Sequence, residues 1–248
     1  MIIVGYMYKL FIISMIIILY YKYGKSCLIN YAPAVSRYFS LTKYFPKSDI
    51  DGVVELAMIA ASHVLFCALL IVILPVKFAV IHVDWVDVPA YFIYGVLLGI
   101  GCMGLSALLC KIAIKLVDLF RKDGAYNLKS WLTMGRGGWI KHHLQSIEIL
   151  PIYLSLLILV MQVGSEEVIF RGVILNYFMQ FGDFAAFSTA WILFVLMQAF
   201  LMNKWQCAIF PMIGAGVMGF IHSVLYLQVP ILWPLIIAHV TFFLFSVI

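Results

Sequence analysis

Charged side chains are scarce in this sequence. Only 11% of its 248 residues are Asp, Glu, Lys or Arg, whereas about 25% is usual for a soluble domain. Hydrophobic residues make up 65%, which leaves too little polar surface for a large soluble domain. The 16 basic residues are too clustered to read as a nucleic-acid-binding surface. We therefore expect a protein whose partner is the lipid bilayer, and which binds no nucleic acid.

Cysteine is also sparse, and its spacing indicates no special chemistry. None of the five cysteines forms a C-x-x-C pair, and all of them fall in apolar runs or in the segments that connect them (Cys27, Cys67, Cys102, Cys110 and Cys207). A disulfide framework and a structural zinc site are therefore not indicated. No metal ion and no other cofactor is expected from the sequence.

What the chain has in abundance is apolar runs. About 20 apolar residues cross a bilayer as a helix, and runs suited to such crossings lie at 2–21, 53–76, 88–112, 149–180, 184–202, 207–228 and 230–248. The pattern predicts an all-α fold, a polytopic transmembrane helical bundle of seven or eight helices. We divide it into an N-terminal region of transmembrane helices with basic loops, 1–147, and a C-terminal region, 148–248.

Basic residues gather in two segments between the apolar runs. Five Lys and Arg residues lie between 22 and 51, and seven lie between 111 and 141. Because basic loops tend to remain in the cytoplasm, we expect the loops 22–51 and 111–147 to be cytoplasmic. The N-terminus is then external, and the remaining connections alternate across the membrane.

One apolar run is too long for a single straight crossing. Residues 149–180 would form a continuous helix of about 48 Å, against a hydrocarbon core of about 30 Å. We expect this helix to tilt, to re-enter or to break. Gly164–Ser165 is the natural break, because Ser165 can cap a new helix. A break there would make eight helical segments rather than seven.

The same run contains an unusual polar stretch, GSEEVIFRG at 164–172. Glu167 and Arg171 are four residues apart and face each other on a helix. Their pairing offsets the free-energy cost of placing each charge at membrane depth. Glu166 is rotated by about 100° around the helix and has no partner nearby in the sequence. A carboxylate in that position is either protonated or holds a water, as a general base does.

Few other polar side chains lie in the apolar runs to meet Glu166. They include Gln198, His222, His239 and His63. We favour a structural role for His63, hydrogen-bonded within the core among apolar neighbours. His239 is a better candidate for the site, because it lies in the last run, shortly after a proline that favours a helix start.

Together these elements resemble a known family. GSEEVIFRG, a run that contains Phe194, a glycine-spaced run and the stretch LWPLIIAH follow one another over about the last 100 residues. This order is similar to that of the CPBP group of intramembrane proteins. The group includes the type II CAAX prenyl endopeptidases and bacterial proteins linked to bacteriocin processing and self-immunity. The resemblance implies a protease core at 148–248 and a location in the bacterial plasma membrane.

The resemblance also implies a role for each matched residue. Glu166 takes the place of the glutamate that activates water. Glu167 and Arg171 take the place of a supporting ion pair. His239 takes the place of a histidine that stabilises the oxyanion. Gln198 stands where the family has a histidine that helps to hold the water.

Two positions therefore depart from the family pattern. Gln198 can still orient a water, but it cannot exchange a proton near neutral pH. Phe243 stands where the family has Asn or Asp beside the oxyanion, and losing such a donor costs about 100- to 1,000-fold in rate. His222, one helix earlier, is a candidate substitute for the missing histidine.

Two functions remain open. The first is a metal-independent, glutamate-dependent intramembrane endopeptidase that cleaves a membrane-associated peptide, such as a prenylated protein or a leader peptide. The second is a family member that has lost catalysis and serves as a membrane binding, immunity or scaffolding protein. Intact Glu166 and His239 favour the first, whereas the changes at Gln198 and Phe243 favour the second. A proton-relaying transporter is less favoured, because no inverted repeat is visible.

Overall fold

The computed structural model describes residues 2–39, 47–76, 87–120, 139–200 and 205–247. Within these ranges, all regular secondary structure is helical. In the part of the chain that the structure describes, six helical stretches are long and apolar enough to cross a membrane, and a seventh, Trp233–Ser246, is apolar but shorter. The predicted all-α membrane bundle is confirmed.

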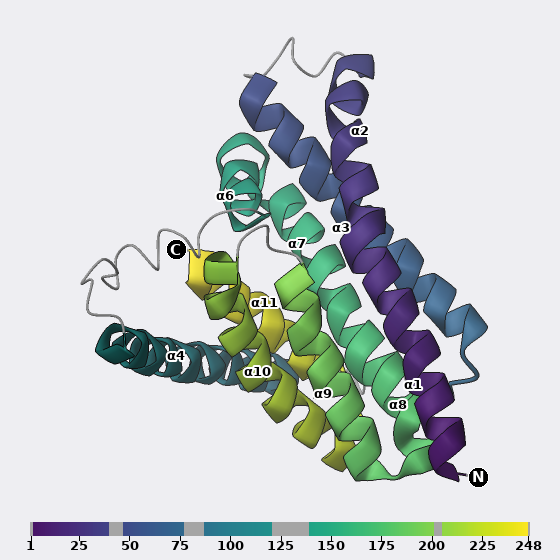
Figure 1. Cartoon of the computed structure of the whole chain (residues 1–248). Helices are drawn as coiled ribbons and strands as arrows, with labels where there is room; N and C mark the ends of the chain where they lie inside the picture. The colour runs from purple at the N-terminus through teal and green to yellow at the C-terminus, as the bar shows by residue number, and fades with distance from the viewer. Residues whose placement is uncertain (1, 40–46, 77–86, 121–138, 201–204, 248) are drawn as a thin grey trace.

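The N-terminal part of the chain forms one long rod (Figure 1). α1 (Ile2–Ile18), the π-helical turn η1 (Leu19–Gly24) and α2 (Lys25–Tyr38) follow one another without a break. α3 (Lys47–Ile73) packs against α2. The prediction that 22–51 is a loop is therefore wrong, since most of it is helical. The physical reason is that basic residues mark where a chain leaves the hydrocarbon, and a helix can continue past that point.

The second basic segment is also more helical than predicted. α4 (Val88–Phe120) includes its beginning and α6 (Trp139–Ile149) includes its end, so the prediction of a loop over 111–147 is wrong at both ends. Residues 121–138 lie outside the described part of the chain. α6 buries one face against α3, as expected of a short amphipathic helix. The cytoplasmic location of this segment stays a prediction.

The long apolar run does not break at Gly164–Ser165. α7 (Ile152–Glu167) runs through both residues and passes directly into the π-helix η3 (Val168–Leu175). The Ser165 hydroxyl donates to the carbonyl oxygen of Met161, 2.6 Å away, so it caps no new helix. A single glycine inside a helix costs only about 1 kcal/mol. α7 packs against α3 and α11, and this packing offsets a cost of that size.

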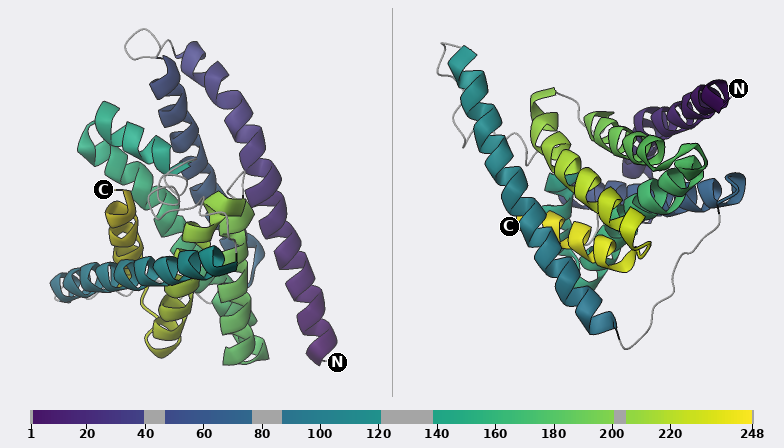
Figure 2. Two further views of the ribbon diagram at one scale, coloured as in Figure 1. Left: turned by 60° about the vertical axis from the view of Figure 1, so that its left-hand side comes forward. Right: turned by 90° about the horizontal axis from the view of Figure 1, so that it is seen from below.

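The chain reverses after η3 at Gly182. This residue has a φ of 99°, a conformation that a glycine adopts without strain. Two short elements precede it and three long helices follow it: α8 (Asn176–Phe178), η4 (Met179–Phe181), α9 (Asp183–Phe200), α10 (Trp205–Gln228) and α11 (Trp233–Val247). α9 and α10 pack side by side, and α4 lies across α10 and α11 (Figure 2).

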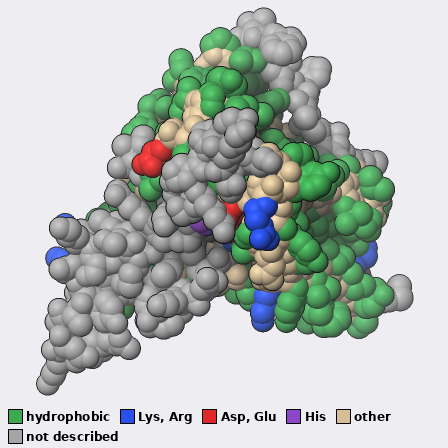
Figure 3. Space-filling view, turned by 90° about the horizontal axis from the view of Figure 1, so that it is seen from above, with side chains coloured by type: hydrophobic (Ala, Val, Ile, Leu, Met, Phe, Trp, Pro, Cys, Tyr) green, Lys and Arg blue, Asp and Glu red, His purple; other side chains and the backbone are tan. Residues whose placement is uncertain are grey.

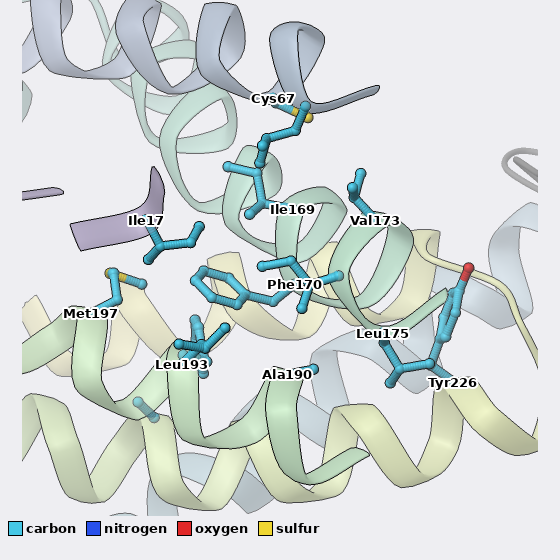
Figure 4. Packing of buried hydrophobic residues seen from close by; sticks show 14 of the residues in the cluster. Ile17, Cys67, Ile169, Phe170, Val173, Leu175, Ala190, Leu193, Met197 and Tyr226 are labelled. Carbon is cyan, nitrogen blue, oxygen red and sulfur yellow. The ribbon is translucent and has the colours of Figure 1, made fainter. Parts of the chain in front are cut away.

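The largest cluster of buried apolar side chains surrounds η3 (Figure 4). Phe170 lies at its centre, with Cys67 of α3 above it in this view, Leu193 of α9 below it, and Ile17 of α1 and Met197 of α9 together to its left. N-terminal and C-terminal helices thus share one core. The described surface seen from above is largely hydrophobic as well, with few charged side chains (Figure 3), as expected of a protein that faces lipid.

α4 crosses α11 at close range because two glycines face it. A Cβ atom on Gly95 would lie 2.7 Å from the carbonyl oxygen of Pro234, and one on Gly99 would lie 2.7 Å from the Cβ atom of Thr241. Small residues at this four-residue spacing allow helix backbones to approach closely in a membrane. The contact fixes the position of α11, which includes His239.

Candidate active site

The candidate residues meet where α7 passes into η3. Glu166 and Glu167 are the last two residues of α7 and are 1% and 0% exposed. A π-helical turn widens the helix and frequently lies at a functional site. Here the Asn176 side chain donates to the carbonyl oxygen of Gly172 at 2.7 Å, and to the Tyr226 hydroxyl at 2.9 Å. These bonds anchor the widened turn to α10.

Glu167 is enclosed by nitrogen-bearing side chains from three elements. Its carboxylate lies 3.3 Å from Arg171 Nη1, and its Oε1 accepts a hydrogen bond from His239 Nδ1 at 2.8 Å. His222 Nδ1 lies 3.2 Å from the same oxygen, close enough for an ion pair but without the alignment of a hydrogen bond. The spacing in the sequence links Glu167 to Arg171 alone, because only that partner is one helical turn away.

The guanidinium of Arg171 is held against an aromatic ring. Its central carbon lies 4.3 Å from the centre of the Phe194 ring, a cation–π distance. The same ring meets His239 edge-on, with 5.9 Å between ring centres. Gly219 of α10 makes this possible, since a Cβ atom there would lie 3.1 Å from Phe194 Cδ1. Phe194 therefore supports both the ion pair and His239.

Glu166 has a different environment. Its Oε2 atom lies 4.0 Å from His239 Nε2, and its Oε1 atom lies 3.7 Å from His63 Nε2. Both distances are too long for direct hydrogen bonds. Within the described part of the chain, neither Oε1 nor His63 Nε2 has a hydrogen-bond partner. The structure thus brings Glu166 and His239 together and adds His63, for which the sequence predicts a structural role in the core.

His63 is 1% exposed and is held at its other nitrogen. Nδ1 lies 2.9 Å from the carbonyl oxygen of Ile59 and 3.1 Å from the Tyr20 hydroxyl of η1. The expectation of a hydrogen-bonded core histidine is therefore correct for Nδ1 and wrong for Nε2, which faces Glu166. In the sequence, His63 is marked only as a polar residue at membrane depth. Its contact with Glu166 could not be predicted, because α3 and α7 are far apart in the chain.

Gln198 lies on the His239 side of the site. Together with Phe243 and His239 it lines a cavity of about 30 Å³, whose lining does not include Glu166. A space of that size holds about one or two waters. Gln198 is 5% exposed, and its Oε1 has no hydrogen-bond partner among the described residues. Its contact with a water on Glu166 stays a prediction.

His222 faces the paired carboxylate. It is fully buried, and Glu167 is the acidic side chain it approaches. This position favours a role in holding Glu167 over the predicted role of a substitute water-binding histidine. No group of three or more His, Cys, Asp and Glu side chains in the described ranges is arranged to hold a metal ion.

Comparison with known families supports the resemblance predicted from the sequence. Residues 148–245 match the family model described as Type II CAAX prenyl endopeptidase Rce1-like. No curated protein and no solved structure matches the chain significantly. The matched stretch contains Glu166, Glu167, Arg171 and His239, whereas His63 lies outside it. The resemblance to CAAX-type proteases is therefore confirmed for this stretch.

Proposed function

Because residues 148–245 match a family of CAAX prenyl endopeptidases, we propose that this integral membrane protein is a glutamate-dependent intramembrane endopeptidase. One observation carries the proposal. Glu166 is 1% exposed and lies between two imidazole nitrogens, at 3.7 Å and 4.0 Å, without a direct hydrogen bond to either. A buried carboxylate in that setting can bind a water and take up its proton.

In the proposed reaction, Glu166 accepts a proton from the water as the water oxygen bonds to the carbonyl carbon of the peptide. The carbon–nitrogen bond of the tetrahedral intermediate then breaks, and the proton held by Glu166 passes to the leaving nitrogen. The products are a carboxylic acid and an amine. The carboxylate acts as the base, so the proposal requires no metal ion.

His239 supplies the contact to the oxyanion in this proposal. Its Nδ1 donates to Glu167 at 2.8 Å, while its Nε2 lies on the Glu166 side. A carboxylate that accepts a hydrogen bond from Nδ1 fixes the orientation of the imidazole, as in a Ser-His-Asp triad. When Nε2 also carries a proton, it can donate to the oxyanion. Phe243 adds no donor, so this contact depends on one side chain.

The proposed substrate is a peptide segment that reaches the site from the membrane, such as a prenylated C-terminus or a leader peptide. The matched family supports a peptide substrate in a membrane. The burial of Glu166 and Glu167 within a candidate span supports cleavage at membrane depth. A substrate with a hydrophobic anchor can enter such a site without exposing the carboxylates to bulk water.

A second function is favoured by the two altered positions. Phe243 offers no hydrogen bond, and the cavity that it lines beside His239 has a volume of only about 30 Å³. In this alternative the chain binds or scaffolds another membrane protein, in immunity or in complex assembly. The two glutamates would then serve only to hold the helices together.

Glu166→Gln separates the two functions. The full-length protein in liposomes is supplied with an internally quenched, farnesylated peptide that ends in a CAAX sequence. An endopeptidase should lose at least about 100-fold in kcat, with unchanged abundance. Equal background cleavage by both proteins would instead favour the binding function. Inhibition by a chelator that zinc reverses would overturn the metal-independent reaction.

A further inference from the structure

We propose that His63 is a second water-binding catalytic residue, so that the N-terminal region supplies part of the active site. The inference rests on the proposed endopeptidase function. His63 belongs to α3, and the family match begins only at residue 148. What points to it is the geometry around Glu166.

A water fits the positions of two unpartnered atoms. His63 Nε2 and Glu166 Oε1 are 3.7 Å apart, and both belong to side chains that are at most 2% exposed. Neither atom has a hydrogen-bond partner within the described ranges, although buried polar atoms rarely lack one. A water about 2.8 Å from each atom would satisfy both at once.

The neighbours of His63 determine which ring nitrogen carries the proton. Nδ1 lies 2.9 Å from the carbonyl oxygen of Ile59. A carbonyl oxygen only accepts hydrogen bonds, so Nδ1 is the donor. In the neutral ring, Nε2 then has a free lone pair and faces Glu166 as an acceptor.

Tyr20 is a positioning residue for this ring. Its hydroxyl lies 3.1 Å from His63 Nδ1 and 2.8 Å from Ser62 Oγ. Ser62 in turn donates to the Ile59 carbonyl oxygen at 2.7 Å. The Tyr20 ring stacks on Phe66 with 3.9 Å between ring centres. The π-helical turn η1 thereby holds α3 in the register that aims Nε2 at Glu166.

A water at this point is prepared for attack. It donates one hydrogen to Glu166 and the other to His63 Nε2, which leaves an oxygen lone pair for the peptide carbonyl carbon. Glu166 takes the first proton as the carbon–oxygen bond forms, and later gives it to the leaving amine. His63 keeps the second O–H oriented, and that hydrogen leaves with the carboxylic acid. His63 thus orients the water from α3, outside the stretch that matches the family model, and exchanges no proton with it.

Turnover of the same farnesylated peptide tests the proposal in the full-length protein. His63→Ala should lower kcat by about 100-fold or more, with little change in KM. The matched control is His143→Ala, which removes another buried histidine, 2% exposed, from α6 and should leave kcat unchanged. If His63→Ala keeps most of the wild-type kcat while Glu166→Gln does not, His63 holds no catalytic water, although the endopeptidase function stands.

A spectroscopic measurement decides the question without turnover. Nitrogen NMR of the ¹⁵N-histidine-labelled protein distinguishes protonated from bare ring nitrogens, and His63→Gln identifies the relevant signals by their loss. We expect a protonated Nδ1 and a bare Nε2 whose signal shifts in Glu166→Gln. Tyr20→Phe should shift the Nδ1 signal and lower kcat without raising KM. A protonated Nε2 would overturn the proposal, because that atom could not accept the water hydrogen.

Discussion

Glu166 and Glu167 are neighbours in the chain, yet they face two different regions of the molecule. Glu167 faces the C-terminal helices, where three nitrogen-bearing side chains approach its carboxylate to within 3.3 Å. Glu166 faces α3 of the N-terminal region as well as α11, and its nearest imidazole nitrogens are 3.7 Å and 4.0 Å away. Glu167 thus accepts a direct hydrogen bond through Oε1, whereas Glu166 has no direct hydrogen bond to either imidazole.

The contrast shows how one helix can hold a structural and a reactive carboxylate side by side. Direct contact with a cation keeps a buried carboxylate ionised and fixed, but it also occupies the lone pairs that a general base needs. The cation-rich side is built inside the stretch that matches a protease family. The open side is completed by α3 and η1, which lie outside that stretch.

The largest expected effect is on the side of Glu167. Arg171→Ala leaves this carboxylate buried without its guanidinium, and breaking a buried ion pair in this way costs about 3 to 5 kcal/mol. Protein abundance and the Tm in detergent should both fall sharply. Arg171→Lys keeps the charge but not the planar stacking on Phe194. Its abundance and Tm should therefore lie between those of the wild type and of Arg171→Ala. Normal abundance of the alanine variant would mean that the pair does not hold the helices.

His239 and His222 sharpen the comparison, because both approach Glu167 while only His239 also approaches Glu166. His239→Gln should lower kcat by about 100-fold, as expected for the loss of an oxyanion donor. His222→Gln should lower the Tm and change kcat far less. The measurements are peptide turnover and thermal unfolding of both variants. Equal losses of kcat would remove the distinction between the two sides of α7.

The position of α11 can be tested at α4. Gly99→Val should destabilise the protein by about 1 to 3 kcal/mol, as overpacking does, because a Cβ atom at Gly99 would lie 2.7 Å from that of Thr241. Since α11 contains His239, kcat should fall too. Gly101→Val is the matched control, for a Cβ atom there has nothing within 4 Å. An equal response of both variants would show that the glycine contact does not position α11.

The smallest expected effect lies in α6, outside the candidate spans. Burial lowers the pKa of His143 to about 4, and its hydrogen bond to Gln162 opposes part of that shift. Between this value and the ordinary pKa of about 6.5, the unfolded chain binds the proton and the folded one does not. Stability should therefore fall as the pH drops below about 6.5, by less than about 1 kcal/mol down to pH 6.

Thermal unfolding across this pH range, compared with His143→Gln, measures the contribution of His143. The glutamine variant should show a weaker dependence on pH, because it has no titrating ring at this position. The same pH dependence in both proteins would assign it to other groups. Peptide turnover, which depends on Glu166 in the proposed reaction, should be unchanged in His143→Gln. Measuring it checks that the variant keeps its active site.

Local rules of helix geometry were enough to anticipate part of this protein. The scarcity of charge and the length of the apolar runs predicted a helical membrane bundle, because a bilayer admits little else. The spacing of Glu167 and Arg171 placed them on one face, because four residues make about one helical turn. The order of GSEEVIFRG, the run that contains Phe194, the glycine-spaced run and LWPLIIAH indicated the family resemblance, which the match to residues 148–245 confirms.

Helix boundaries were predicted less well. The rod from α1 to α2 and the extension of α4 run through segments whose basic residues suggested loops. Gly164 and Ser165 suggested a break where α7 continues. In each place a local signal for an end was outweighed by the hydrogen bonds and packing of a continuing helix, whose strength depends on neighbours that are distant in the chain.

The amino-acid sequence alone was sufficient to predict the membrane location, the helical fold and the pairing of Glu167 with Arg171. Each of these depends on residues within a few helical turns of one another. Only the tertiary structure brought His63 and Tyr20 to Glu166, and His222 to Glu167. Such contacts depend on where α3, α7, α10 and α11 cross. The crossings follow from side-chain packing along whole helices, for example at Gly95 and Gly99, and no short stretch of sequence specifies them.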